Sequence, residues 1–139
     1  MRWVRCSGST SVAIGIVLAA SVALAQAKTP SETGAQFYMR YRAAFDKAKA
    51  FEEIAPFMSG KSRKDMESKS ADQRKKMFGL VKMLGAVQSP KVVKEEKTAD
   101  GATLTVEGIE PMEQKKATGT IKLIREDGGW KLDSESWSS

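Results

Sequence analysis

Cysteine and histidine are almost absent from this chain. Its 139 residues include no histidine and a single cysteine, Cys6, which lies ahead of an apolar run near the N-terminus. If that end is removed as a leader, the remaining chain has neither residue. Disulfides, thiol nucleophiles, zinc sites with the usual ligands and histidine acid–base chemistry are then excluded. We therefore expect no metal site and no cofactor.

The first 27 residues have the order of a secretory signal peptide. Arg2 and Arg5 precede the apolar run Val12–Ala25, and small residues follow at 23–27. An uncleaved membrane anchor is the alternative, but this run is shorter than the roughly 20 residues that a spanning helix needs. We predict a single mature domain over residues 28–139, periplasmic or secreted, which meets the membrane only transiently through its signal peptide.

Positive charge is concentrated in one region of the chain. The formal net charge is +6, and removing the two leader arginines leaves +4. Residues 61–82 hold eight basic and three acidic side chains, a net charge of +5. Such a region either forms a solvated face, the interpretation we favour, or meets anionic lipid or a polyanion. Nucleic acid is not an expected partner, because aromatic side chains do not interleave with these lysines.

A first helix is predicted from Pro30. Thr29-Pro30-Ser31-Glu32 has a threonine cap, a proline in the first turn and a glutamate three residues after the cap, which is a capping box. Apolar side chains then recur at helical spacing and predict one aromatic face: Phe37, Tyr41, Ala44, Phe45 and Ala48.

Two further helical segments are predicted to end near Leu84. Residues 51–58 form a short element that ends at Ser59–Gly60, Ser62 and Ser70 are candidate caps, and Gly85 closes the last helix. The predicted packing stripe of that helix is Met77, Leu80, Val81 and Leu84.

From Gln88 the pattern alternates, as in strands. Asp100-Gly101 is a predicted turn, and the charged stretch Lys94–Lys97 then lies opposite Leu104. We expect this hairpin tip to project beyond the packed part of the sheet. The clearest turn is Asp127-Gly128, which predicts three strand pairs: Arg125 with Trp130, Leu123 with Leu132, and Ile121 with Ser134.

This final hairpin predicts two different faces. Ile121, Leu123, Trp130 and Leu132 share the inner face, and Lys122 meets Asp133 on the other. The inner face then tapers to small residues, which suggests a pocket under the aromatic helix. Its predicted lining is Phe37, Tyr41, Phe45, Ile121, Leu123, Trp130, Ser134 and Ser136. The alternative is that an aromatic ring fills this space.

Three apolar residues are predicted on or near the outer face of the sheet: Ile109, Ile124 and Trp137. Such a group on one exposed face suggests a partner, and the simplest is a second copy bound through the sheet. A monomer is the alternative.

The last hairpin contains Asp127-Gly-Gly-Trp-Lys-Leu132, and the first helix contains Phe37-Tyr-Met-Arg-Tyr41. These motifs, in a chain of helices followed by a four-stranded antiparallel sheet, resemble the nuclear transport factor 2-like superfamily. The resemblance implies an α+β fold in which N-terminal helices pack on a curved, cone-like sheet, often with a ligand cavity and dimerisation through the sheet. No catalytic residue of the ketosteroid-isomerase-like members carries over to this chain.

Three functions remain open from the sequence. The first is an exported, non-catalytic domain that binds a small apolar or amphipathic ligand or a protein. The second is an interaction module that uses the outer sheet face or the basic region. The third is a pocket enzyme without histidine or cysteine, for which Tyr38, Tyr41 and Asp46 are the nearest candidates.

Overall fold

Helices occupy the first half of the structure and strands the second half. The computed structural model describes residues 32–139, so the predicted signal peptide and the predicted cap at Thr29 lie outside the described residues. The α+β prediction is confirmed. In chain order the elements are α1 (Gly34–Lys47), the 3-10 turns η2 (Phe51–Glu53) and η3 (Ala55–Phe57), α2 (Gly60–Glu67), α3 (Ala71–Leu84), β1 (Gln88–Lys97), β2 (Gly101–Ile109), β3 (Lys116–Glu126) and β4 (Gly129–Ser138).

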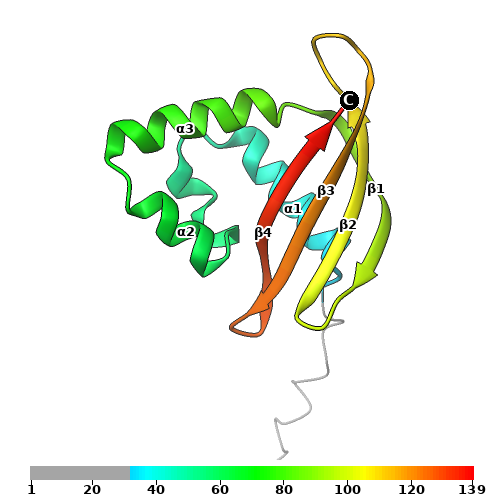
Figure 1. Ribbon diagram of the computed structural model, residues 1–139, viewed down its shortest axis with the longest axis horizontal. Coiled ribbons are helices and arrows are strands. Elements are labelled where there is room, and N and C mark those ends of the chain that lie inside the picture. Colours follow the sequence, from blue (N-terminus) through cyan, green and yellow to red (C-terminus); the bar gives the residue numbers. More distant parts are fainter. Residues whose placement is uncertain (1–31) are drawn as a thin grey trace, which may run out of the picture. The chain divides into compact units, whose positions relative to one another are not determined.

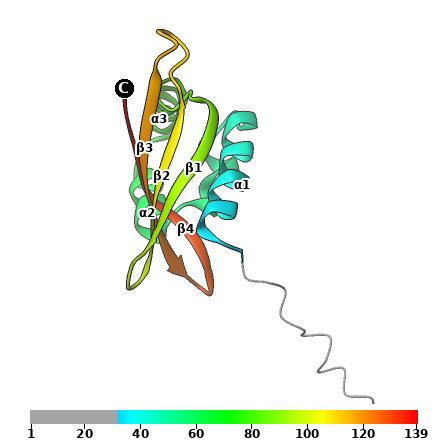
Figure 2. The ribbon, with the colours of Figure 1, turned by 90° about the vertical axis from the view of Figure 1, so that its right-hand side faces the viewer.

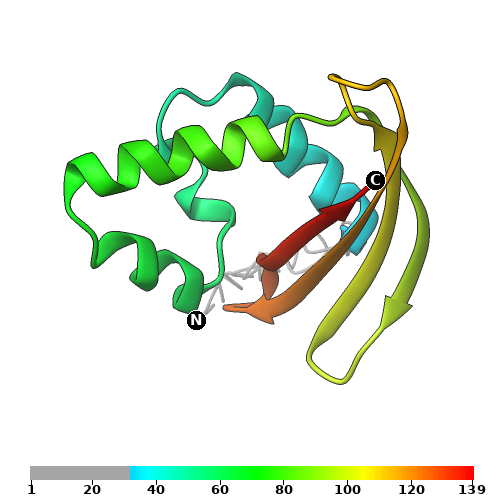
Figure 3. The same ribbon diagram turned by 45° about the horizontal axis from the view of Figure 1, so that its top comes forward.

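The strands form one antiparallel sheet in the order β1-β2-β3-β4, which curves around α1 (Figures 1 and 2). Helix α1 crosses one face of this sheet, whereas α2 and α3 lie beside the edge strand β4 (Figures 1 and 3). In the part of the chain that the structure describes, no helix covers the other face, and no helix is long and apolar enough to cross a membrane.

The N-terminus of α1 is held by a strand. The helix begins at Gly34 with a capping box between Thr33 and Gln36, one turn later than predicted. The carboxylate of Glu95 on β1 accepts hydrogen bonds from the backbone N–H groups of Gly34, at 3.1 Å, and Ala35, at 3.4 Å. A negative charge at this end of a helix is stabilised by unpaired amides and the helix dipole.

Because of this contact, the prediction that the β1–β2 hairpin tip projects beyond the packed region is wrong. Glu95 does lie opposite Leu104, as the pattern required, but it faces inward and meets the end of α1.

Two of the three predicted features at the ends of α2 and α3 are confirmed. Ser70 caps α3 through a box with Gln73, and Gly85 ends it. The prediction of a cap at Ser62 is wrong, because Ser59 caps α2 and accepts a hydrogen bond from the Ser62 backbone N–H.

The predicted packing stripe of α3 is wrong. Phe78 is the one buried residue of this helix, and its ring packs on Phe45 with the centroids 6.4 Å apart. The predicted stripe is one-third to two-thirds exposed: Met77 38%, Leu80 51%, Val81 45% and Leu84 68%. The reason is the position of α3 beside the sheet, where it contacts η2 and needs only a narrow packing face.

The final hairpin begins as predicted. Its turn residues Asp127 and Gly128 have φ values of 52° and 76°, which a tight hairpin turn requires. The pairs Arg125 with Trp130 and Leu123 with Leu132 are both confirmed.

Beyond Leu132, a β-bulge changes the register. Lys122 lies opposite Ser134, and Ile121 lies opposite Glu135, so Asp133 is an extra residue on β4. The predicted pairs of Ile121 with Ser134 and of Lys122 with Asp133 are therefore wrong. One inserted residue moves every later side chain of the strand to the opposite face.

The bulge exchanges the residues on the two faces of β4. Glu135 and Trp137 turn inward, and Trp137 packs on the core from its position opposite Gly119. A Cβ at Gly119 would lie 2.9 Å from the indole ring, so a glycine is needed there. Ser134 and Ser136, predicted on the inner face, are exposed on the outer face.

The bulge predicts unequal effects on stability for two neighbouring substitutions. Trp137→Ala should lower the free energy of unfolding by about 2 kcal/mol, because it removes an indole from the core. Ser136→Ala, on the outer face, should change it by less than about 0.5 kcal/mol. Urea unfolding of both variants measures the difference. Equal, small effects would mean that Trp137 lies on the outer face.

Candidate functional site

The space predicted as an interior pocket is packed with aromatic and aliphatic side chains. Five of the predicted lining residues are at most 2% exposed: Phe37, Tyr41, Phe45, Ile121 and Leu123. Phe57 from η3 also enters this core, with its ring centroid 6.0 Å from that of Phe37 and 5.9 Å from that of Tyr41. Trp130 is partly buried against the core and donates a hydrogen bond to the Glu32 carbonyl oxygen.

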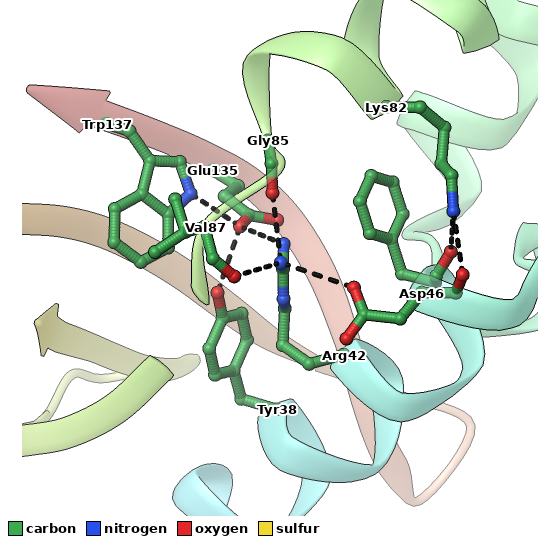
Figure 4. Close-up of polar contacts among 9 residues, drawn as sticks. Tyr38, Arg42, Asp46, Lys82, Gly85, Val87, Glu135 and Trp137 are labelled. Carbon is green, nitrogen blue, oxygen red and sulfur yellow. Dashed lines mark hydrogen bonds and ion pairs between the residues drawn. The ribbon is translucent and has the colours of Figure 1, made fainter. Parts of the chain in front are cut away.

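A buried polar cluster joins α1 to β4 (Figure 4). One oxygen of Glu135, Oε1, accepts hydrogen bonds from the Tyr38 hydroxyl at 2.9 Å and the Trp137 indole N–H at 2.7 Å, and it lies 3.4 Å from Arg42 Nη1. The Arg42 side chain is 2% exposed and that of Glu135 is 14% exposed. A buried ion pair of this kind depends on every polar partner being present.

Arg42 also connects α1 to the segment between α3 and β1. Its Nη2 atom donates to the carbonyl oxygens of Gly85 at 2.9 Å and Val87 at 3.4 Å, and lies 3.5 Å from Asp46 (Figure 4). The Nε atom has no hydrogen-bond partner in the structure. The guanidinium group thus holds three parts of the fold together.

The two tyrosines beside this cluster cannot act as bases at neutral pH. Burial raises the pKa of both Tyr38 and Tyr41 far above the ordinary value, and the charge of Glu135 raises it further, against a smaller opposing effect of Arg42. Asp46, the third candidate of the enzyme hypothesis, has a side chain that is 60% exposed. The cluster therefore holds the fold together and offers no activated nucleophile.

Sequence reasoning missed Arg42 and Glu135. Arg42 stands among apolar residues, four positions after Tyr38 and three before Phe45, and a charge at such a position indicates a buried partner. For Glu135 the sequence signal is the position of Trp137. In a regular strand Trp137 and Leu132 would lie on opposite faces of the sheet, so two apolar residues at this spacing indicate a bulge between them.

A separate cavity lies between α3 and the turn after α1. Its volume is about 600 Å³. Its apolar wall includes the rings of Phe51 and Phe78, both largely buried, and Gly79. The complete lining is Ala48, Lys49, Ala50, Phe51, Glu52, Ala71, Arg74, Lys75, Phe78, Gly79 and Lys82.

Two of the four cations around this cavity have partners. Lys82 donates to the Phe45 and Asp46 carbonyl oxygens at the C-terminus of α1, at 2.6 and 3.0 Å (Figure 4). Arg74 forms an ion pair with Glu52 at 3.4 Å, and this carboxylate is the only one in the lining.

The other two cations, Lys49 and Lys75, form no ion pair within residues 32–139. The cavity therefore combines an apolar wall with a surplus of positive charge.

A second cavity, of about 360 Å³, lies between α3 and the edge of β4. Its lining brings together Val81 and Leu84 from α3 with Glu135 and Trp137 from β4. Of the predicted pocket residues, this cavity includes Phe45 and Ser136. Because Glu135 is already held by Tyr38 and Arg42, we regard the first cavity as the better candidate site.

The predicted sheet interface loses one of its three residues. Trp137 faces inward, whereas Ile109 and Ile124 lie half-buried on the outer face. Their neighbours there are mainly hydroxyl side chains in two rows, Thr103–Lys122–Ser134 and Thr105–Thr120–Ser136. Dimerisation through this face stays a prediction.

Metal binding has no evident site within residues 32–139. The described side chains include no group of three or more histidine, cysteine, aspartate or glutamate residues placed to hold an ion.

The raised pKa values predict loss of stability in alkali. The folded state holds both phenolic protons more tightly than the unfolded chain does. The contribution of these two tyrosines to the free energy of unfolding is therefore fully present below pH about 10 and is lost as the pH rises further. Phenolate absorbance should therefore appear together with loss of circular dichroism. Since Tyr38 and Tyr41 are the only tyrosines, the signal is unambiguous. A phenolate that forms near pH 10 in the folded protein would contradict the burial.

Comparison of the chain with protein-family models, curated proteins and solved structures finds no match. The resemblance to the nuclear transport factor 2-like superfamily therefore stays a prediction.

Proposed function

We propose that this is an exported, non-catalytic domain that binds an anionic amphipathic molecule in the cavity between α3 and the turn after α1. The observation that carries the proposal is the pairing of an apolar wall with cations that lack carboxylate partners. An acyl or aromatic group carrying a carboxylate, sulfonate or phosphate has both properties that such a cavity would recognise.

The size of the cavity and its buried aromatic wall suit the apolar part of such a ligand. A volume of about 600 Å³ lies within the range of roughly 300 to 1,000 Å³ that is usual for small-molecule sites. Phe51 and Phe78 are 4% and 6% exposed, so their rings form a fixed wall. A hydrocarbon chain that packs against these rings would be removed from water, and its binding would break no hydrogen bond of the two rings.

Two lysines of the lining suit the anionic part of the ligand. Lys49 and Lys75 lie on different sides of the cavity, one after α1 and one on α3, so an acidic group between them would meet two charges. A hydrogen bond between an ammonium and an oxyanion is about twice as strong as one between neutral groups.

Binding is favoured over catalysis by the types of residue in the lining. It has no hydroxyl, thiol or imidazole, and its one carboxylate is paired with Arg74. Catalysis by a hydroxyl, thiol or imidazole group has no side chain to use in this lining, and lysine amines are the only nucleophiles there apart from the paired carboxylate.

The test uses Gly79, which lines the cavity from the middle of α3. A Cβ at this position would meet no atom within 4 Å, so a larger side chain can enter the cavity without a clash at the backbone. In the mature protein, residues 28–139, Gly79→Leu should lower the affinity for laurate at least about tenfold in titration calorimetry.

The matched control is Gly79→Ala, which adds one methyl group. It should change laurate affinity by less than about threefold and stabilise the helix by about 0.5–1 kcal/mol. Unchanged laurate binding by a folded Gly79→Leu variant would place the ligand elsewhere, and absence of laurate binding by the original protein would overturn the proposal for acyl anions.

The lysines give a separate prediction about charge. Lys49→Gln and Lys75→Gln together should weaken laurate binding by about tenfold, because each variant loses a charge-assisted hydrogen bond. Binding of the uncharged analogue dodecanol should change by less than about twofold. Equal losses for laurate and dodecanol, measured by the same calorimetry, would mean that the lysines shape the cavity and do not select the anion.

A further inference from the structure

The carboxylate of Glu135 uses only one of its two oxygens in the core. The hydrogen bonds from Tyr38 and Trp137 and the contact with Arg42 all end on Oε1 (Figure 4). Tyr41 is close enough for burial and the Glu135 charge to raise its pKa, but its hydroxyl is not in hydrogen-bonding geometry with this carboxylate. Within residues 32–139, Oε2 therefore accepts no hydrogen bond, although a carboxylate oxygen can accept about two.

This second oxygen is open to a small molecule. In the part of the chain that the structure describes, Arg42 Nε is the one buried side-chain polar atom without a partner. Oε2 also lacks a partner, so it is not sealed in the core, and Glu135 lines the cavity of about 360 Å³ between α3 and the edge of β4. A molecule in this second cavity can therefore hydrogen-bond to Oε2 while Tyr38, Trp137 and Arg42 keep their contacts with Oε1.

The rest of the second cavity is mostly apolar. Phe45 and Trp137 contribute aromatic rings, and Val81 and Leu84 contribute aliphatic side chains from α3. Glu135 is the only charged residue in the lining. This cavity thus offers an acidic acceptor within an apolar wall, whereas the first cavity offers cations.

The charges near Oε2 suit a cation. Arg42 is shared between two carboxylates, because its Nη1 atom contacts Glu135 and its Nη2 atom lies 3.5 Å from Asp46. One guanidinium thus faces two negative groups. Lys82 donates to carbonyl oxygens of α1 and lines the first cavity, not this one.

The end of α3 and the indole of Trp137 strengthen this preference. Gly85 caps the C-terminus of α3 and lines the cavity, and this end of a helix dipole stabilises positive charge. The face of an indole ring also attracts cations. A hydrogen bond from an ammonium to a carboxylate is about twice as strong as one between neutral groups.

We propose that the second cavity binds a small amphipathic amine, whose ammonium donates to Glu135 Oε2 and whose hydrocarbon part packs against Val81 and Leu84. A volume of about 360 Å³ is near the lower limit of roughly 300 Å³ for small-molecule sites, so one aromatic ring with a short chain suits it. The packed rings of Phe45 and Phe78 lie in the walls of the second and the first cavity, respectively. The amine site is therefore separate from the proposed anion site and selects the opposite charge.

Three probes with the same phenyl group test this site: phenethylamine, phenethyl alcohol and phenylacetate. Each is titrated into the isotope-labelled mature protein, residues 28–139, while NMR follows the indole N–H resonance of Trp137. The only other tryptophan of the mature chain is Trp130, so the variant Trp137→Phe identifies the signal. We expect phenethylamine to bind at least about tenfold more tightly than phenethyl alcohol, and phenylacetate to leave the resonance unshifted.

Val81→Phe tests where the amine binds. The larger ring would enter the second cavity from α3 and should weaken phenethylamine binding at least about tenfold. Leu80→Phe is the matched control, because Leu80 is 51% exposed and lines neither cavity, and it should change the affinity by less than about twofold. Gly79→Leu, which blocks the first cavity, should also leave phenethylamine binding unchanged, so failure of this site and failure of the anion site are distinguishable.

Glu135→Gln tests the charge. Glutamine keeps an acceptor oxygen for Tyr38 and Trp137 but removes the negative charge, so the preference for phenethylamine over phenethyl alcohol should fall below about twofold. Circular dichroism shows whether this variant folds, since Arg42 loses its ionic partner on β4. If it does not fold, the comparison of probes and Val81→Phe decide the question.

Three results would overturn the inference. One is that phenethylamine at millimolar concentration does not shift the Trp137 resonance. Another is equal affinity for phenethylamine and phenethyl alcohol, because the cavity would then recognise the phenyl group alone. The third is unchanged phenethylamine binding by folded Val81→Phe, which would place the amine elsewhere.

Discussion

The fold depends on one extra residue in its last strand. Asp133 interrupts the alternation of β4, and the interruption turns Glu135 and Trp137 toward the helices. Glu135 then meets Tyr38 and Arg42 of α1. Without the bulge, two serines would face this part of the core, and the guanidinium of Arg42 would be buried with no inward-facing carboxylate from β4. An uncompensated buried charge is among the most destabilising features that a core can contain.

Charges also fix the position of α1 along its length. Glu95 of β1 lies at its N-terminus, Glu135 of β4 meets its middle, and Lys82 of α3 binds the carbonyl oxygens near its C-terminus. The two terminal contacts have the signs that stabilise a helix dipole. Three other elements therefore hold α1 by polar contacts, while its aromatic residues fill the space against the sheet. This arrangement explains why the interior is packed and the larger cavity lies outside it, beside α3.

Most features that depend on neighbours in the sequence were predictable, apart from the cap at Ser62 and the first turn of α1, and features that depend on distant contacts were not. The α+β order, the cap at Ser70, the stop at Gly85 and the Asp127–Gly128 turn are local, and all are as predicted. The buried face of α3 was not predictable, because periodicity identifies an apolar stripe without saying whether another element covers it. The candidate cavity was missed for a related reason: its lining comes from two segments that are both unremarkable alone, and only their packing creates it.

The irregularities of the sheet fall on its two edge strands, β1 and β4. Both edge strands are poor templates for a further strand, because regular, flat edges are the ones that recruit other chains. On one edge, β4 has its bulge and a short bridge from Met58. On the other, β1 has two register shifts, Pro90 and a series of lysines. The residue that directs Glu135 into the core thus also helps to keep an exposed edge strand from pairing with copies of itself.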